Sequence, residues 1–230
     1  PIRGVAVGNE VLDALPVKRF RRAGDGWEEL GVALVEGGFG WTTLPADAPL
    51  AEALTRLEAD LPAPLPEGYV SEINPRLPAF VAGVADCLER GALLWIDYGM
   101  PRHEYYMPER AGGTLMCHYR HRAHDDPFRL VGLQDITAWV DFTALAEAGE
   151  AAGLEILGYT PQAQFLLGAG LERFAAEVDP ADTRAYARLS REIQHLTLPG
   201  EMGERFKVMM QGRGVDAPSA FRMLDLRNRL

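Results

Sequence analysis

The feature that most constrains this 230-residue chain is a run at residues 92–97, in which five apolar side chains are followed by an aspartate. A continuous apolar run that ends in an acid is typical of a parallel strand buried on both faces. Residues 2–7 have a similar apolar character and predict a second buried strand. Because predicted helices alternate with strands along the chain, the sequence indicates an α/β sheet.

The remaining segments predict one domain, over residues 1–230, with an insertion in its sheet. Residues 17–66 are expected to form this insertion, in which antiparallel strands are joined by glycine-rich turns and followed by a short helix. The rest of the core is predicted over residues 67–211, with a loose tail over 212–230. Within that core we expect helices at about 74–90, 141–152, 162–178 and 181–195, and further strands at 114–119, 154–159 and 206–211.

Composition excludes several classes of function. The chain has 23 Lys and Arg against 33 Asp and Glu, a net charge of −10, which argues against binding nucleic acid through its phosphates. Two cysteines are too few for a disulfide framework or a four-cysteine zinc site, so a reducing compartment is expected. The longest apolar run is far short of the roughly 20 residues of a membrane helix, and no membrane span is expected.

Polar side chains follow both predicted buried strands. Asn9, Glu10 and Asp13 come after the first strand, and Asp97 and Tyr98 end the second. Ligands of open α/β sheets bind at the carboxyl ends of the strands. An amide and carboxylates there can hold an amine or a guanidinium, or accept a proton. The alternative interpretation is a helix cap, a solvated turn and a local backbone contact.

A histidine-rich segment allows a different hypothesis. His118, His121 and His124 lie close to Cys117 in the sequence, and such groups can bind zinc or iron for a metal-dependent hydrolysis. Three arginines crowd the same segment with positive charge, however: Arg120, Arg122 and Arg129. We therefore expect no metal, and a polar loop with one functional histidine.

Several short motifs, taken together and in order, carry a resemblance to a known family. They are Asn9-Glu10-x-x-Asp13-Ala14-Leu15-Pro16, Ile96-Asp97-Tyr98-Gly99, Gly113-Thr114-Leu115, Tyr119-Arg120-x-x-x-x-His124, Asp135-Ile136-Thr137-Ala138-x-Val140-Asp141-Phe142, Gln164-Phe165-Leu166 and Met202-Gly203-Glu204-x-Phe206-Lys207-Val208-Met209. With these motifs the chain resembles the MidA-type methyltransferases, the family of the mitochondrial complex I assembly factor that methylates arginine, and its bacterial relatives. It departs from the family pattern at Leu133-Gln134, where Pro-Gly is usual, and at Val11 and Leu12, which replace phenylalanines.

The resemblance implies a class I, Rossmann-like methyltransferase fold that uses S-adenosylmethionine. In the family's sheet order, 3-2-1-4-5-7-6, this chain would supply strands 4, 5, 7 and 6 and correspond to the later half. The first strands, with their glycine-rich cofactor loop, would be missing, and a segment is expected before Pro1. Such a chain should bind S-adenosylmethionine weakly alone, and form a homodimer through the bare strand or pair with the missing half.

The resemblance also implies roles for individual residues. Asn9 and Glu10 would lie at the cofactor, and the catalytic groups would be Glu10, Asp13, Asp97 and His124. Asp97, Tyr98 and Asp135 would contact the substrate, a protein arginine, with His124 or one carboxylate taking the proton. The protein substrate would be a respiratory-complex subunit, in the bacterial cytoplasm or the mitochondrial matrix. The rival hypothesis is a catalytically incomplete piece that acts as a partner-binding scaffold.

Overall fold

The computed structural model describes residues Pro1–Leu230, which form two compact units. The first unit contains residues 1–11, 78–100 and 142–230, and the second contains residues 12–77 and 101–141. The predicted insertion at 17–66 lies wholly within the second unit, together with residues 101–141, which the sequence assigns to the remaining core. No helix in the structure is both long and apolar enough to cross a membrane.

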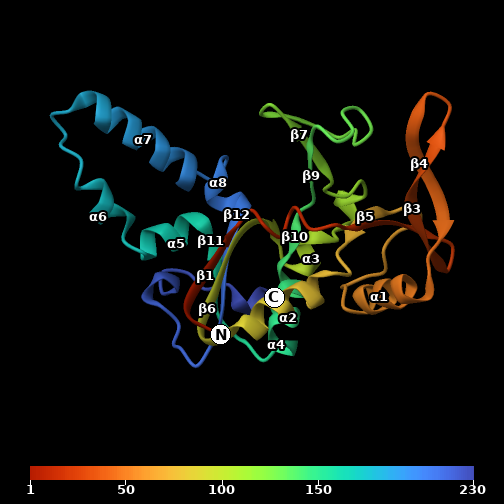
Figure 1. Cartoon of the computed structure of the whole chain (residues 1–230), viewed down its shortest axis with the longest axis horizontal. Coiled ribbons are helices and arrows are strands. Elements are labelled where there is room, and N and C mark those ends of the chain that lie inside the picture. The colour runs from red at the N-terminus through yellow and green to blue at the C-terminus, as the bar shows by residue number, and fades with distance from the viewer. The chain divides into compact units, whose positions relative to one another are not determined.

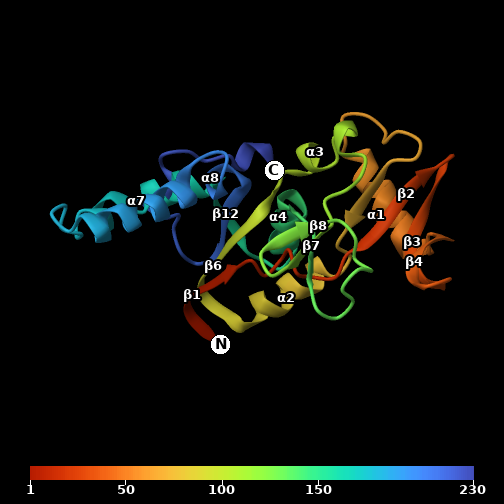
Figure 2. The ribbon, with the colours of Figure 1, turned by 90° about the horizontal axis from the view of Figure 1, so that it is seen from above.

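A mixed sheet is the centre of the first unit (Figure 1), and its strands follow the order β1-β6-β12-β11. The strands are β1 (Ile2–Asn9), β6 (Leu88–Met100), β11 (Glu155–Pro161) and β12 (Phe206–Arg213). β1 and β6 run parallel and lie side by side in both views (Figures 1 and 2), whereas β12 is antiparallel to β6 and to β11. The sheet therefore has the mixed α/β character that the apolar runs predict.

Helices of the first unit pack on this sheet or extend from it. They are α2 (Leu77–Cys87), α4 (Phe142–Ala151), α5 (Gln162–Gly168), α6 (Leu171–Ala175), α7 (Thr183–Thr197) and α8 (Met202–Arg205), with the 3₁₀ turns η2 (Ser219–Phe221) and η3 (Arg227–Arg229). α4 approaches β12 closely because Gly149 leaves room for the buried Gln211, whose amide donates to the Leu145 carbonyl over 2.8 Å. A Cβ at residue 149 would lie 2.1 Å from that amide nitrogen.

The second unit contains two antiparallel sheets. One has the order β4-β3-β2-β5 and the other β8-β7-β9. Their strands are β2 (Lys18–Ala23), β3 (Gly26–Val35), β4 (Gly38–Pro45), β5 (Val70–Ile73), β7 (Met116–Tyr119), β8 (Arg122–His124) and β9 (Asp135–Thr137). The short β10 (Val140–Asp141) is part of neither sheet. The helices are α1 (Ala48–Ala59), α3 (Arg102–Tyr105) and the 3₁₀ turn η1 (Pro108–Arg110).

Burial of the two apolar runs differs from the expectation. β6 is buried along most of its length, as predicted. β1 is mostly exposed, with Val5 at 60% and Val7 at 61%. The prediction of a buried first strand is wrong for this structure because β1 is the last strand on its side of the sheet, so its side chains lack neighbours there.

Three further expectations need correction. The helix predicted to reach residue 90 ends at Cys87, because the pairing with β1 extends β6 back to Leu88. The helix predicted over 162–178 breaks at Gly170, which has a φ of 94°. The tail is not loose, because Phe221 is buried against Phe165 and fills the space left by Gly158.

Two glycines let β1 and β6 come together. Gly4 lies opposite Gly91 in the parallel register, and Gly91 has a φ of 142°, which L-residues with side chains rarely adopt. A Cβ at residue 91 would lie 1.8 Å from the Gly4 carbonyl oxygen. The contact between the two strands therefore requires glycine at position 91.

We expect Gly91→Ala to lower the free energy of unfolding by about 3 kcal/mol, because it combines backbone strain with a collision between strands. Urea denaturation monitored by circular dichroism would measure the loss. The matched control is Gly83→Ala in the middle of α2, where nothing lies within 4 Å of the new Cβ. There alanine should stabilise the helix by about 1 kcal/mol, and equal effects of the two changes would contradict this account.

Candidate active site at the carboxyl ends of β1 and β6

The parallel pairing brings the predicted polar groups of the first unit together. Asn9 lies opposite Ile96, and the Glu10 N–H donates to the Ile96 carbonyl over 2.9 Å. Asp97 follows Ile96 directly in β6. The pairing therefore places Asn9 and Glu10, at the end of β1, beside the Ile96–Asp97 segment of β6, which continues to Met100.

Glu10 holds an unusual backbone conformation. Its φ is 50°, in the left-handed region that only a few non-glycine residues occupy. Asn9 Nδ2 donates to Glu10 Oε1 over 3.2 Å, so the neighbouring amide orients the carboxylate. Both side chains are exposed and available to a ligand. Such backbone strain costs on the order of 1–3 kcal/mol and is found most often at functional sites.

Asp97 has the opposite environment, because only 1% of the residue is exposed. Its Oδ1 accepts the Tyr98 backbone N–H over 2.9 Å, and it lies opposite Lys207 in the register with β12. The Tyr98 ring packs edge-on against Phe206, with centroids 5.4 Å apart. Asp97 is thus a buried carboxylate with a fixed orientation, whereas Glu10 is exposed.

A tryptophan fixes the backbone just before this point. The Trp95 indole N–H donates to Gln211 Oε1 over 3.0 Å, and the ring covers Gly8. A Cβ at residue 8 would lie 2.7 Å from Trp95 Cε3. Position 8 therefore has to be glycine for β1 to end where it does, one residue before Asn9.

The other predicted site residues belong to the second unit. Asp13 is buried, and its backbone carbonyl accepts the Ala138 N–H over 3.0 Å. Asp135 is exposed at the start of β9, opposite His118 in β7. His124 lies opposite Cys117, and both of its ring nitrogens are buried without a hydrogen-bond partner. Their roles in a common site with Glu10 stay predictions.

The three histidines do not converge. Arg120 and His121, both with positive φ, form the two-residue turn between β7 and β8, so the expected loop is a hairpin. His118 and His124 occupy different positions in its ladder. No group of three or more His, Cys, Asp or Glu residues is arranged to hold a metal ion.

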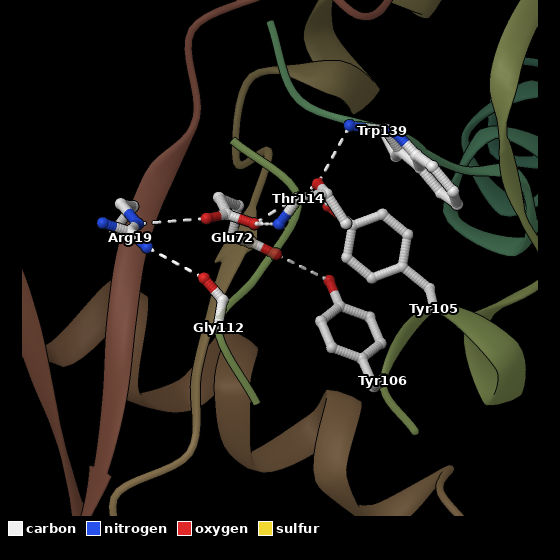
Figure 3. A network of polar contacts seen from close by, with 7 residues as sticks. All are labelled: Arg19, Glu72, Tyr105, Tyr106, Gly112, Thr114 and Trp139. Atoms are coloured by element: carbon white, nitrogen blue, oxygen red, sulfur yellow. Dashed lines mark hydrogen bonds and ion pairs between the residues drawn. The ribbon is translucent and has the colours of Figure 1, made fainter. Parts of the chain in front are cut away.

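The sequence analysis missed a polar network in the second unit (Figure 3). Its centre is Glu72, whose side chain is completely buried and whose Oε1 accepts from Arg19 Nε over 3.0 Å. Glu72 Oε2 accepts the Thr114 N–H over 2.7 Å, and Arg19 also donates to the Gly112 carbonyl. The network therefore joins β2, β5 and the segment before β7.

Two tyrosines extend this network. Tyr106 donates to the Glu72 backbone carbonyl over 2.9 Å, and the Tyr105 hydroxyl lies 3.0 Å from Thr114 Oγ1. Burial, with the nearby Glu72 carboxylate as a further cause for each, holds the pKa of both phenols well above the usual value. Thr114 Oγ1 in turn accepts a hydrogen bond from the Trp139 backbone N–H over 3.0 Å. The only sequence signal for this cluster is Gly113-Thr114 within a family motif.

We expect Glu72→Gln to destabilise the second unit by about 3 kcal/mol, because it removes the negative partner of the part-buried Arg19. Hydrogen exchange of the β2 and β5 amides would report the loss locally. Glu28→Gln is the matched control in the same sheet, since Glu28 pairs with the more exposed Arg21. The control should cost under about 1 kcal/mol, and equal losses would contradict the importance of Glu72.

The two cysteines should differ in reactivity. Burial raises the pKa of the Cys117 thiol, and the Asp126 and Asp125 carboxylates raise it further, so less thiolate forms at a given pH. Cys87 is exposed. We expect iodoacetamide at pH 8 to alkylate Cys87 in the folded protein and Cys117 only after unfolding, as followed by peptide mass spectrometry. Rapid alkylation of Cys117 in the native state would refute this.

Comparison with known proteins shows which proteins this chain is similar to. The profile of the family described as "Putative S-adenosyl-L-methionine-dependent methyltransferase" matches residues 1–160. A COG1565 superfamily structure from Burkholderia thailandensis, bound to S-adenosyl-homocysteine, is 48% identical with a TM-score of 0.92, and the match covers 100% of this chain and 58% of that one. A second, native crystal structure of a COG1565 protein from the same organism is also 48% identical, with a TM-score of 0.92, and 60% of it is covered.

Curated relatives agree with this result. The mitochondrial protein arginine methyltransferase NDUFAF7 of Danio rerio is 28% identical over 211 residues, and its Caenorhabditis elegans homologue is 28% identical over 209. Each match covers 88% of this chain and 46% of the relative, so the chain spans about half the length of the curated relatives it matches. The chain belongs to this family of S-adenosyl-L-methionine-dependent methyltransferases.

Proposed function

We propose that this chain forms the acceptor side of an S-adenosylmethionine-dependent methyltransferase, and that the methyl acceptor is an arginine side chain of a protein. The observation that carries the proposal is the parallel pairing of β1 with β6, in which the Glu10 backbone N–H donates to Ile96, the residue before Asp97. The printed names of the NDUFAF7 relatives support arginine as the acceptor.

Two polar residues after β1 fit a cofactor that carries a sulfonium cation. Asn9 offers an exposed amide and Glu10 an exposed carboxylate. The left-handed backbone conformation of Glu10 follows directly after the end of β1. S-adenosylmethionine, when bound, would supply the methyl group. Asn9 and Glu10 are the groups of this chain that we assign to holding it.

Methyl transfer to a guanidinium depends mainly on position and charge. Two carboxylates can bind a cationic guanidinium through charge-assisted hydrogen bonds. In this proposal the buried Asp97 fixes the orientation, with Tyr98 beside it, and the exposed Glu10 closes on the substrate. Glu10 then takes the proton that the nitrogen loses.

The sheet order supports a finer assignment of the fold. We assign β1, β6, β12 and β11 to strands 4, 5, 7 and 6 of a class I methyltransferase sheet, in which strand 7 is antiparallel. The observed order β1-β6-β12-β11, with β12 antiparallel to both neighbours, is consistent with that assignment. We further propose a respiratory-complex subunit as the protein substrate, with action in mitochondria or the bacterial cytoplasm, because the named relatives are mitochondrial.

Substitution of the two carboxylates tests the proposal. In the full-length protein, Glu10→Gln and Asp97→Asn should each lower the single-turnover rate of methyl transfer about 100-fold, because each removes a charged contact with the acceptor. Asparagine at 97 keeps the oxygen that accepts the Tyr98 N–H, so the fold should persist. Glu89→Gln, at the other end of β6, is the matched control and should have the wild-type rate.

Three results would overturn the proposal or one of its parts. Wild-type rates in both carboxylate variants would remove Glu10 and Asp97 from the site. Calorimetric titration separates the rival hypothesis, a scaffold without catalysis: a full-length protein that does not bind S-adenosylmethionine would support the scaffold. Acid hydrolysis of the labelled product should yield methylarginine, and methyllysine would exclude the guanidinium acceptor.

A further inference from the structure

The core of the first unit contains a glutamine that has no part in the chemistry described above. Gln211 lies on β12, and none of the residue is exposed to solvent. A buried amide is unfavourable unless its oxygen and its nitrogen both find hydrogen-bond partners. Here the oxygen accepts the Trp95 indole N–H over 3.0 Å, and the nitrogen donates to the Leu145 carbonyl over 2.8 Å. Gln211 therefore links β12, β6 and α4 through one side chain.

The helix that faces this amide is adapted to it. Gly149 lies within α4, although glycine forms helices less readily than alanine. A Cβ at residue 149 would lie 2.1 Å from Gln211 Nε2, so alanine does not fit there while Gln211 keeps its position. A buried amide and a glycine inside a helix are both arrangements that stability alone does not favour. Natural proteins retain such local conflicts mainly where function requires them.

The hydrogen bond from Trp95 to Gln211 selects one orientation of the indole. Rotation of the ring about its bond to Cβ is only weakly restricted, so either edge can face β1. The indole N–H and the Cε3 atom lie on opposite edges of the ring, and only the N–H can donate. Because Gln211 holds the N–H, Cε3 and Cζ3 are the atoms that cover Gly8, at 2.7 and 2.8 Å from where a Cβ at residue 8 would lie. Gln211 thus determines which edge of the ring faces the end of β1.

No other contact of the ring makes this selection. Phe80 of α2 also packs on Trp95, with ring centroids 6.2 Å apart, but a phenyl ring has no acceptor that would distinguish the N–H edge. Gly8 lies opposite Trp95 in the parallel register, and Asn9 is the next residue along β1. The orientation of the indole therefore bears directly on the backbone that leads into the candidate site.

We propose that Gln211 is a positioning residue of the methyltransferase: by holding the Trp95 indole in one orientation, it keeps the end of β1 in the arrangement that binds the cofactor. This inference rests on the proposed function, which assigns Asn9 and Glu10 to holding S-adenosylmethionine. Both polar atoms of the Gln211 amide are occupied by Trp95 and Leu145, so Gln211 acts through the ring and not by contact with a ligand.

Loss of the amide should affect cofactor binding rather than the rate of the bound enzyme. When the ring has two orientations and only one is competent, the apparent dissociation constant rises by the reciprocal of the competent fraction. Bound cofactor has already selected the competent orientation. In the full-length protein, Gln211→Met should therefore raise KM for S-adenosylmethionine about tenfold and change kcat by less than about twofold. A role in stability alone would not separate KM from kcat in this way.

The orientation of the ring can also be measured without cofactor. In protein labelled with 5-fluorotryptophan, ¹⁹F NMR gives a signal for each tryptophan, and Trp95→Phe identifies the signal of residue 95 by its loss. The wild type should give one resonance for this residue. Gln211→Met should give two resonances, or one that is broadened by exchange, because methionine is unbranched like glutamine but offers the indole only a weak sulfur acceptor.

The matched control is Leu157→Ala on β11. Leu157 is buried, and its truncation leaves a cavity in the same sheet, so this variant should lose at least as much stability in urea as Gln211→Met. β11 pairs with β12 but with neither β6 nor β1. The control should therefore keep the wild-type KM and the wild-type ¹⁹F resonance of residue 95.

A single, unshifted resonance of residue 95 in Gln211→Met would overturn the proposal, and so would a wild-type KM in that variant. Should Gln211→Met fail to fold, the double variant with Trp95→Phe decides, because it leaves no indole N–H buried without a partner. Its KM should stay about tenfold above the wild-type value, since a phenyl ring does not cover Gly8 in the same way. A wild-type KM there would equally refute the role of Gln211.

Failure of the proposed function has a different signature. Wild-type turnover in Glu10→Gln, together with two resonances of residue 95 in Gln211→Met, would show that Gln211 orients the ring but that the end of β1 does not serve the reaction. Reduced turnover in Glu10→Gln, together with a single resonance in Gln211→Met, would leave the proposed function standing and overturn the role of Gln211.

Discussion

The parallel pairing of β1 with β6 is the constraint on which the candidate site depends. Gly91 allows the two backbones to approach at Gly4, and Gly8 leaves room for Trp95 near the other end of the ladder. Between these contacts the register is fixed, and a slip of one residue would turn every side chain of β1 to the opposite face of the sheet. Asn9 and Glu10 therefore lie beside the Ile96–Asp97 segment of β6 because of glycines that have no chemical role themselves.

The second unit depends on a different interaction, a buried ion pair. Glu72 accepts hydrogen bonds from Arg19 and from the Thr114 backbone, and Gly113, with a φ of 78°, leaves room for the carboxylate. A buried carboxylate that is paired on both oxygens holds its neighbours in one arrangement, whereas an unpaired one would be strongly unfavourable. The Arg19 guanidinium also lies 4.8 Å from the centre of the Trp41 ring, so the ion pair helps to position a side chain of β4 as well.

The sequence predicted those parts of the fold that depend on local pattern. The run at 92–97 identified β6, and glycine turns identified the hairpin of β2 and β3, because apolar period and turn chemistry are local properties. It also predicted the strand at residues 2–7, which pairs parallel with β6, whereas a common site of Asn9, Glu10 and Asp97 stays a prediction. The exposure of β1, the packing of Phe221 and the Glu72 network could not be predicted, because each depends on which residues, distant in sequence, become neighbours.

The carboxylates of Glu10 and Asp97 both stand in arrangements that cost stability, which is consistent with a functional site. Glu10 keeps a left-handed backbone that glycine or asparagine would adopt at lower cost, and Asp97 is a buried acid within β6. Neither arrangement is one that stability alone favours, and natural proteins retain such local conflicts mainly where function requires them. In the proposed function, Glu10 and Asp97 would therefore have different roles: the buried Asp97 would orient a cationic acceptor, and only the exposed Glu10 would have to move as that acceptor enters and leaves.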